Sequence, residues 1–339
     1  MYHVYTRIED GGSPQSRKGT TTMAMSSSAR RAYRRAAKEK KKRLRGHWLL
    51  IQKGDSPKEI ISKLFTQLCV LVLVGCAAVL GREGYLSISA QLINQRMKGL
   101  YEQAAGWVEH IGEGELLPGA KSLLAVNPDT VGYIRIDGTE VDLPIVQAKD
   151  NDKYLTVAFD GSSNKAGSIF LDYRCELGWR ERSDNIVLYG HNQRDRTMFG
   201  SLKDYKHDLE HYKAHPTITL CSNYEMDTYK IFAYFVIEAL PSQTYDGVLF
   251  DYHNYIDLSD RQVYDRYMDN VMLRSQIITT VDTQYGDKFL TLSTCSNEFE
   301  PSRFVIIARK ARPGEDDTVD VSGAYINTQA KEPDWGAIY

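Results

Sequence analysis

Three residues at the ends of predicted strands have the side chains that nucleophilic catalysis requires. Cys295 ends the apolar run 289–294, Arg303 follows eight residues later, and His191 comes just after the apolar run 185–189. The thiolate is the reactive form of cysteine, and a neighbouring cation favours it. Histidine can carry a proton near neutral pH, and arginine can hold an oxyanion. The pattern predicts a nucleophile, a proton carrier and an oxyanion holder at strand ends.

Each of these residues also has an ordinary structural interpretation. A lone cysteine in a strand is usually a small buried residue, and a lone histidine is usually structural or solvated. Arg303 could instead form a salt bridge with Glu298 or Glu300, which are close in the sequence. Cysteine–histidine spacings do not transfer between enzyme families. Spacing alone therefore leaves both interpretations open.

Turns and apolar runs predict a mainly β fold around these residues. The predicted strands are short, apolar or β-branched, and separated by Asp-Gly and similar turns. They cover residues 131–136, 141–146, 168–172, 185–189, 217–221, 229–240, 289–294 and 304–308. Eight such strands indicate a closed or nearly closed β-barrel.

Two helices are predicted beside these strands. Apolar residues at helical spacing over residues 87–108 predict an amphipathic helix that packs on the barrel. Ser259 is predicted to cap a second helix, in which Val263, Tyr267 and Val271 share one face.

A membrane-spanning helix is predicted near the N-terminus. Residues 64–80 are uncharged and mostly apolar, and with Ile60 and Ile61 the run approaches the ~20 residues that a spanning helix needs. A buried core helix is the alternative, but the run is apolar all round. Ten Lys or Arg against Glu39 precede it in residues 30–45. Positive residues stay on the cytoplasmic side, so the N-terminus is predicted to be cytoplasmic and the C-terminal part extracellular.

The same basic block could be a nucleic-acid arm or a solvated tail. The apolar run that follows favours a topology determinant, so we expect no nucleic-acid partner. No small-residue cleavage pattern follows the run, which favours a retained single-pass anchor in the plasma membrane over a removed signal peptide.

Composition divides the chain into four segments. The net charge is only −2, so the basic N-terminal block is balanced by an acidic remainder. The last segment is acidic and polar, and we expect it to wander over the surface. The expected segments are a disordered, basic cytoplasmic extension (1–59), a transmembrane helix (60–81), an extracellular catalytic domain (82–312) and a polar, acidic C-terminal tail (313–339).

The motifs around the three candidate residues resemble those of the sortase transpeptidases, specifically class B. The ordered set covers roughly residues 85–310, and resemblance of this extent is far more specific than one motif. It includes Tyr189-Gly190-His191-Asn192, Thr291-Leu292-Ser293-Thr294-Cys295, Arg303-Phe304, Asn151-Asp152-Lys153-Tyr154-Leu155 and Ala166-Gly167-Ser168-Ile169-Phe170-Leu171-Asp172-Tyr173-Arg174.

The resemblance implies a fold and a set of site residues. The implied fold is a sortase-like eight-stranded β-barrel with an N-terminal helix and a helical insertion between strands 6 and 7. Cys295 is the implied nucleophile, His191 the proton donor and acceptor, and Arg303 the oxyanion holder. The implied substrate-binding residues are Asn151, Leu155, Tyr255, Ile256 and Ser293. No metal or organic cofactor is implied.

The function implied by the resemblance is membrane-anchored cysteine transpeptidation. Such an enzyme cleaves a Thr-containing C-terminal sorting motif of secreted proteins, of the Asn-Pro-x-Thr type in class B. It joins the Thr carboxyl, through a Cys295 thioester, to an amine of a peptidoglycan precursor or cross-bridge. The alternatives are a pilin-polymerising sortase, a hydrolytic cysteine peptidase and a non-catalytic, peptide-binding membrane scaffold.

Four further cysteines are assigned no chemistry. Cys69 and Cys76 lie in the apolar run and are interpreted as small apolar residues. Outside the cell a disulfide between Cys175 and Cys221 is chemically allowed, and the sequence does not fix their distance.

Overall fold

A computed structural model describes residues 26–44, 49–104, 112–206, 208–243, 249–296 and 301–333. Contacts divide the chain into two units, Met1–Val79 and Leu80–Tyr339. The first unit contains α1 (Ser27–Leu44) and the beginning of α2 (Pro57–Gln103). The basic block is therefore helical where it is described, whereas we expected residues 1–59 to be disordered. Ala, Arg and Lys are strong helix formers, which accounts for the difference.

Helix α2 joins two elements that the sequence predicted separately. The expected transmembrane run and the expected amphipathic helix form one continuous helix, because Arg82 and the glycines around it do not interrupt the backbone. Within the second unit, Met97 and Tyr101 of α2 are buried. Val108, predicted to continue this face, lies outside the described residues.

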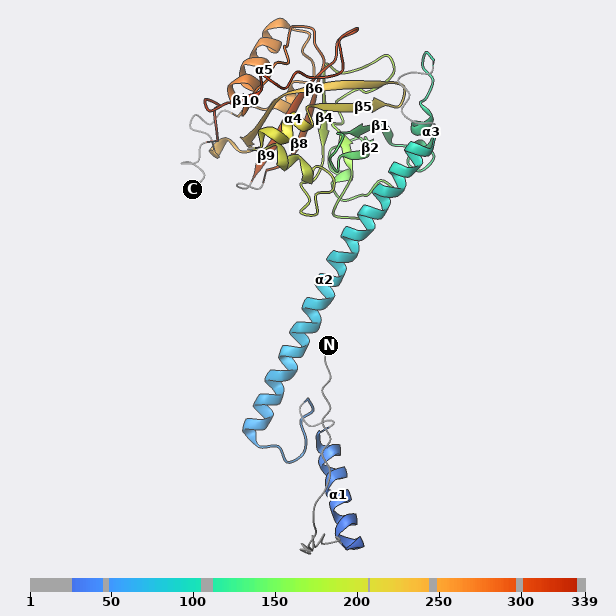
Figure 1. Cartoon of the computed structure of the whole chain (residues 1–339), viewed down its shortest axis with the longest axis vertical. Helices are drawn as coiled ribbons and strands as arrows, with labels where there is room; N and C mark the ends of the chain where they lie inside the picture. The colour runs from blue at the N-terminus through green and yellow to red at the C-terminus, as the bar shows by residue number, and fades with distance from the viewer. Residues whose placement is uncertain are drawn as a thin grey trace, which may run out of the picture. The chain divides into compact units, whose positions relative to one another are not determined.

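Eight strands of the second unit close into a barrel, as predicted (Figure 1). Their order around the barrel is β1-β2-β3-β4-β8-β9-β6-β5. The strands are β1 (Thr130–Arg135), β2 (Asp142–Val146), β3 (Ile169–Leu171), β4 (Asn185–Tyr189), β5 (Thr217–Ser222), β6 (Met226–Glu238), β8 (Phe289–Cys295) and β9 (Ser302–Lys310).

Strand β8 is buried on both faces, although the hydroxyl residues Thr291, Ser293 and Thr294 interrupt its apolar ones. Leu290 and Leu292 pack into the barrel interior. Phe289, on the opposite face, packs in a second cluster with residues of α5 (Arg261–Arg274). Thr291 and Ser293 are also buried, and their hydroxyls form hydrogen bonds with Asn185 (2.9 Å) and Tyr252 (2.7 Å).

Helix α5 is the predicted insertion between the sixth and seventh barrel strands, and its N-cap differs from the prediction. Asp260, not Ser259, accepts hydrogen bonds from the backbone N–H groups of Gln262 (2.8 Å) and Val263 (3.0 Å). Aspartate and serine cap almost equally well, so the sequence could not choose between neighbours.

Removing this cap is expected to cost about 1 kcal/mol of folding free energy. We expect Asp260→Ala to lower the denaturant midpoint, whereas Ser259→Ala should leave it within about 0.5 kcal/mol of the wild type. Chemical denaturation of both variants measures the difference. A larger effect for Ser259→Ala would contradict the cap assignment.

The remaining elements are short. Helix α3 (Pro118–Leu124) packs on the end of α2, where a Cβ on Gly119 would meet the Tyr101 ring at 2.6 Å. Helix α4 (Leu209–Ala214) precedes β5. Strands β7 (Ile277–Ile278) and β10 (Tyr325–Ile326) form a separate two-stranded sheet, on the same side of the barrel as α5 (Figure 1).

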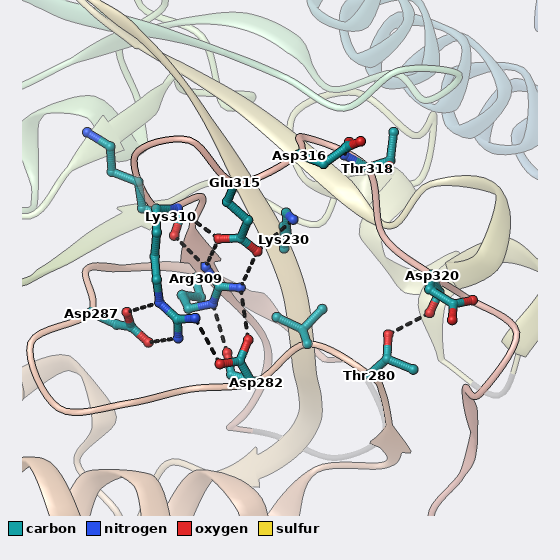
Figure 2. A network of polar contacts seen from close by, with 12 residues as sticks. Lys230, Thr280, Asp282, Asp287, Arg309, Lys310, Glu315, Asp316, Thr318 and Asp320 are labelled. Carbon is teal, nitrogen blue, oxygen red and sulfur yellow. Dashed lines mark hydrogen bonds and ion pairs between the residues drawn. The ribbon is translucent and has the colours of Figure 1, made fainter.

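The C-terminal segment is fixed to the barrel rather than wandering over its surface. Figure 2 shows Glu315 next to two cations of the barrel wall, Arg309 of β9 and Lys230 of β6. Its carboxylate accepts from Arg309 (2.6 and 2.7 Å) and from Lys230 (2.7 Å). The expectation of a wandering tail is thus wrong for the described residues of this segment, which end at residue 333. Trp335 and Tyr339 lie outside them.

Cys175 and Cys221 are both buried free thiols. Cys175 packs in the barrel interior, whereas Cys221 packs in the cluster beneath α2. Burial raises the pKa of both thiols, to about 11 for Cys175 and about 12 for Cys221. The structure therefore contains no disulfide between them, and neither thiol has the character of a nucleophile.

Candidate active site

Strand register brings the three candidate residues to one rim of the barrel. Strands β4 and β8 are parallel, with Tyr189 opposite Ser293. Two residues further along each strand direction come His191 and Cys295. Strands β8 and β9 are antiparallel, with Cys295 directly opposite Arg303. Directly opposed residues of neighbouring strands lie on the same face, so the register alone gathers all three.

A pocket of about 190 Å³ lies at this rim. It is small and shallow, which suits a peptide segment rather than a buried organic cofactor. Its lining residues are Asn151, Leu155, Phe170, Tyr189, Gly190, His191, Ser293, Thr294, Cys295 and Arg303. In the described part of the chain, no three His, Cys, Asp or Glu side chains are grouped so that they could hold a metal ion.

The Cys295 thiol is exposed and faces the guanidinium group of Arg303. Arg303 Nη1 lies 3.9 Å from Cys295 Sγ and donates to the backbone carbonyl of Ser302 at 3.0 Å. Arg303 forms no ion pair with any residue in the described ranges, and Glu298 and Glu300 lie outside those ranges. The cation is thus available to a sulfur anion or to a substrate oxygen.

The histidine is held by a backbone carbonyl on the opposite wall. His191 Nε2 donates to the carbonyl of Leu155 at 2.8 Å. A carbonyl can only accept, so Nε2 carries a proton and Nδ1 is the ring nitrogen left to exchange one. Leu155 therefore orients the imidazole through its backbone carbonyl, and the same residue lines the pocket.

Two neighbouring side chains hold the chain at Cys295 and at the residue that follows it. Asn192 Nδ2 donates to the carbonyl of Cys295 at 2.8 Å. Lys206 Nζ donates to the carbonyl and hydroxyl of Ser296 at 2.9 and 2.8 Å. Neither role was predicted from the sequence. The position of Asn192 directly after the histidine was the only available signal.

The five predicted substrate-binding residues separate into two groups. Asn151, Leu155 and Ser293 line the pocket. Ser293 is buried, and its hydroxyl shares a hydrogen bond of 2.7 Å with the phenol of Tyr252, a residue that the sequence analysis did not select.

Tyr255 and Ile256 are not among the residues that line the pocket. Their carbonyls accept from the side chain and the backbone N–H of Asn185, each at 3.0 Å. Asn185 starts β4, whereas His191 follows its other end. Tyr255 also packs against the ring of Tyr267 in α5. Both residues fix the insertion to the far end of the strand.

A sortase domain model matches residues 134–311, more than half of the chain. Sortase B of Listeria monocytogenes is 30% identical over 254 residues, covering 74% of this chain and 96% of that protein. The chain belongs to the sortase family, in class B. Sortase B of Staphylococcus aureus is 33% identical over 196 residues, covering 57% of this chain and 74% of that protein.

Solved structures agree with this assignment. The structure of a Staphylococcus aureus sortase B–substrate complex superimposes with a TM-score of 0.56 at 27% identity, covering 67% of this chain and 98% of that one. The sortase-like eight-stranded barrel predicted from the sequence is confirmed. This sortase is a cysteine transpeptidase that acts in cell-wall anchoring.

Proposed function

We propose that this sortase uses Cys295, His191 and Arg303 to join secreted proteins to peptidoglycan. The observation that carries the proposal is the exposed Cys295 thiol, 3.9 Å from Arg303 Nη1, in a pocket that His191 also lines. A thiolate beside a fixed cation, with an imidazole at the same rim, is suited to acyl transfer.

The reaction proceeds in two halves. Cys295 passes its thiol proton to His191 Nδ1 and attacks the carbonyl of the motif's Thr as a thiolate, and Arg303 donates to the oxyanion that forms. As the peptide C–N bond breaks, His191 passes the Nδ1 proton to the departing amine, leaving a thioester. An amine of a peptidoglycan precursor or cross-bridge then attacks the thioester. His191 takes the proton of the incoming amine, and the thiolate is released.

The substrate is a C-terminal sorting motif of the Asn-Pro-x-Thr type. The support is membership of class B and the likeness to the Staphylococcus aureus sortase B solved in complex with a substrate, whose chain is covered to 98%. Asn151 and Ser293 offer polar groups at the pocket, and Leu155 offers apolar surface. An extended peptide requires contacts of both kinds.

The chain crosses the plasma membrane once, through residues 60–81. Helix α2 is long and apolar enough to span a bilayer, and none of the residues in its apolar window is buried. The basic extension (1–59) then lies in the cytoplasm, and the catalytic domain (82–312) and C-terminal segment (313–339) lie outside. Protease added to intact cells tests this orientation, because it should digest the catalytic domain and spare the extension.

The decisive experiment for the function is a cleavage panel. Fluorogenic peptides with different C-terminal motifs are incubated with the full-length protein in detergent, with and without an added amine. Cleavage after Thr with an amine-ligated product supports transpeptidation. A purely hydrolysed product would favour a peptidase, a lysine-linked product a pilin polymerase, and no turnover a scaffold.

Replacing Arg303 with lysine separates the contribution of the positive charge to catalysis from that of the guanidinium geometry. Lysine keeps a cation but lacks the planar, multi-donor guanidinium. We expect kcat/KM for the best peptide to fall by about 10²–10³-fold, the loss typical of a removed oxyanion donor. Steady-state kinetics measure the loss, and Arg261→Lys, an exposed arginine of α5, is the control. Wild-type activity of Arg303→Lys would show that a simple positive charge suffices.

A further inference from the structure

A fully buried carboxylate lies directly behind the pocket. Asp172 follows β3, and its side chain is 0 % exposed. It accepts from Arg174 Nε (2.9 Å) and Nη2 (2.8 Å), from the Tyr189 phenol (2.9 Å) and from Asn151 Nδ2 (3.1 Å). Burial alone would raise the pKa of this carboxyl. The hydrogen bonds from Arg174, Tyr189 and Asn151 outweigh burial and hold it below its ordinary value.

The first consequence concerns the amide of Asn151, which lines the pocket. Asn151 Nδ2 donates to Asp172 at 3.1 Å, and Asn151 Oδ1 accepts from the backbone N–H of Tyr173 at 3.0 Å. A flipped amide would place its oxygen against the carboxylate and its NH₂ group against an N–H donor. The unflipped amide keeps one N–H and one lone pair for other partners. Asp172 and Tyr173 thus fix which end of the amide donates.

The second consequence concerns the shape of the surrounding wall. Besides its bonds to Asp172, Arg174 donates to the carbonyl of His253 (2.9 Å) and to Asn254 Oδ1 (2.7 Å). His253 lines a second pocket of about 300 Å³, which shares Asn151, Tyr189 and Arg303 with the first. One carboxylate thereby connects the loop after β2, the end of β4 and the connection before α5.

We propose that Asp172 is a positioning residue for sorting-peptide binding, acting through Asn151, Tyr189 and the Arg174-held connection. This inference rests on the proposed function, because it assumes that the peptide occupies the pocket. Asp172 itself contacts no substrate. It presets the polar groups of three separate wall segments, so that the peptide does not have to order them on binding.

The test is Asp172→Asn in the full-length enzyme, with the Asn-Pro-x-Thr peptide that the wild type cleaves fastest. We expect KM to rise at least about tenfold, while kcat changes less than about threefold. The rate at which iodoacetamide alkylates Cys295 should match the wild type, because it needs no peptide. A merely structural role would lower the melting temperature and leave KM unchanged.

Two further variants connect the effect to its proposed route. If Asp172 acts through Asn151, Asp172→Asn should raise KM much less in an Asn151→Ala background than alone. The matched control is Asp184→Asn, which removes a carboxylate paired with Lys288 at the opposite end of β4. This control should lower stability and leave KM at the wild-type value.

Tyr189→Phe keeps the Asp172–Arg174 ion pair and covers the case in which Asp172→Asn does not fold. We expect this variant to raise KM about threefold, with unchanged alkylation. A wild-type KM in folded Asp172→Asn, or in Tyr189→Phe if Asp172→Asn is unfolded, overturns the inference alone. Failure of the wild type to cleave any Thr-containing peptide overturns the proposed function as well.

Discussion

Replacing Cys295 with alanine is expected to lower transpeptidation by at least about 10⁴-fold, because loss of a nucleophile removes the covalent route entirely. The fold should persist, since Cys295 is exposed and its thiol contacts only Arg303 among the hydrogen bonds of the described residues. Chromatography of the ligated peptide measures the activity. Mass spectrometry of protein quenched during turnover should show an acyl adduct in the wild type and none in the variant.

The matched control is Cys76→Ala, which removes the other exposed cysteine of the described chain, in α2. This variant should retain full activity and the adduct. Turnover by Cys295→Ala within tenfold of the wild type would mean that another group attacks the peptide. The assignment of Cys295 as nucleophile would then be wrong.

Replacing Glu315 with glutamine is expected to destabilise the catalytic domain by about 2–3 kcal/mol. Arg309 is 1 % exposed and Lys230 is 5 % exposed, and both donate to this carboxylate. Removing one partner of a buried ion pair leaves an uncompensated charge, which costs more than the pair contributes. Arg309 retains a 3.4 Å contact with Asp282, which limits the loss.

In a domain of this size the loss corresponds to a melting temperature about 5–10 °C lower. Differential scanning calorimetry measures the shift, with Asp317→Asn as the control, because this neighbouring carboxylate is exposed. An unchanged melting temperature in Glu315→Gln would show that the two cations are solvated in solution.

The contribution of the Glu315 carboxylate to folding stability is expected to decrease at acid pH. Hydrogen bonds from Arg309, the largest influence, together with those from Arg312 and Lys230, hold the pKa of Glu315 far below its usual 4.5. A carboxyl whose pKa is lower in the folded than in the unfolded state stabilises the fold. This contribution is fully present above the pKa of the unfolded state and is lost as the pH falls through the pKa of the folded state. We expect the stability difference between the wild type and Glu315→Gln to be constant above about pH 5.5 and to shrink below about pH 4.5.

Local patterns were sufficient to predict the barrel and the strand ends at which the three candidate site residues lie. All eight predicted strands are present, because each is a short apolar run between turn residues, and that signal needs no distant partner. The predicted boundaries of β4 agree with the structure, whereas β6 begins three residues earlier, at Met226, because its first three residues are only half-buried and include the polar Asp227 and Thr228. The candidate site residues were selected because they lie at the ends of predicted strands and match the motifs of the family.

Contacts between segments that are distant in the sequence could not be predicted, because they produce no local sequence pattern. The hydrogen bond of Asn192 to Cys295 spans 103 residues, and that of Tyr252 to Ser293 spans 41. Glu315 was one acidic residue in an acidic segment, and nothing in its neighbourhood indicated two buried cations. Tyr255 and Ile256 were selected by motif alone, and the structure places them beside Asn185 at the start of β4, not among the residues that line the pocket.

The position of Glu315 after both of its cation partners in the sequence also constrains the order of synthesis and folding. Chains emerge N-terminus first, at about 5–20 residues per second. Lys230 and Arg309 emerge before their shared counter-ion, and β8 and β9 must join β4 and β6 before the barrel can close. The catalytic domain therefore cannot complete these contacts until residue 315 has been made, so a product truncated before that residue would present Cys295 on a less stable scaffold.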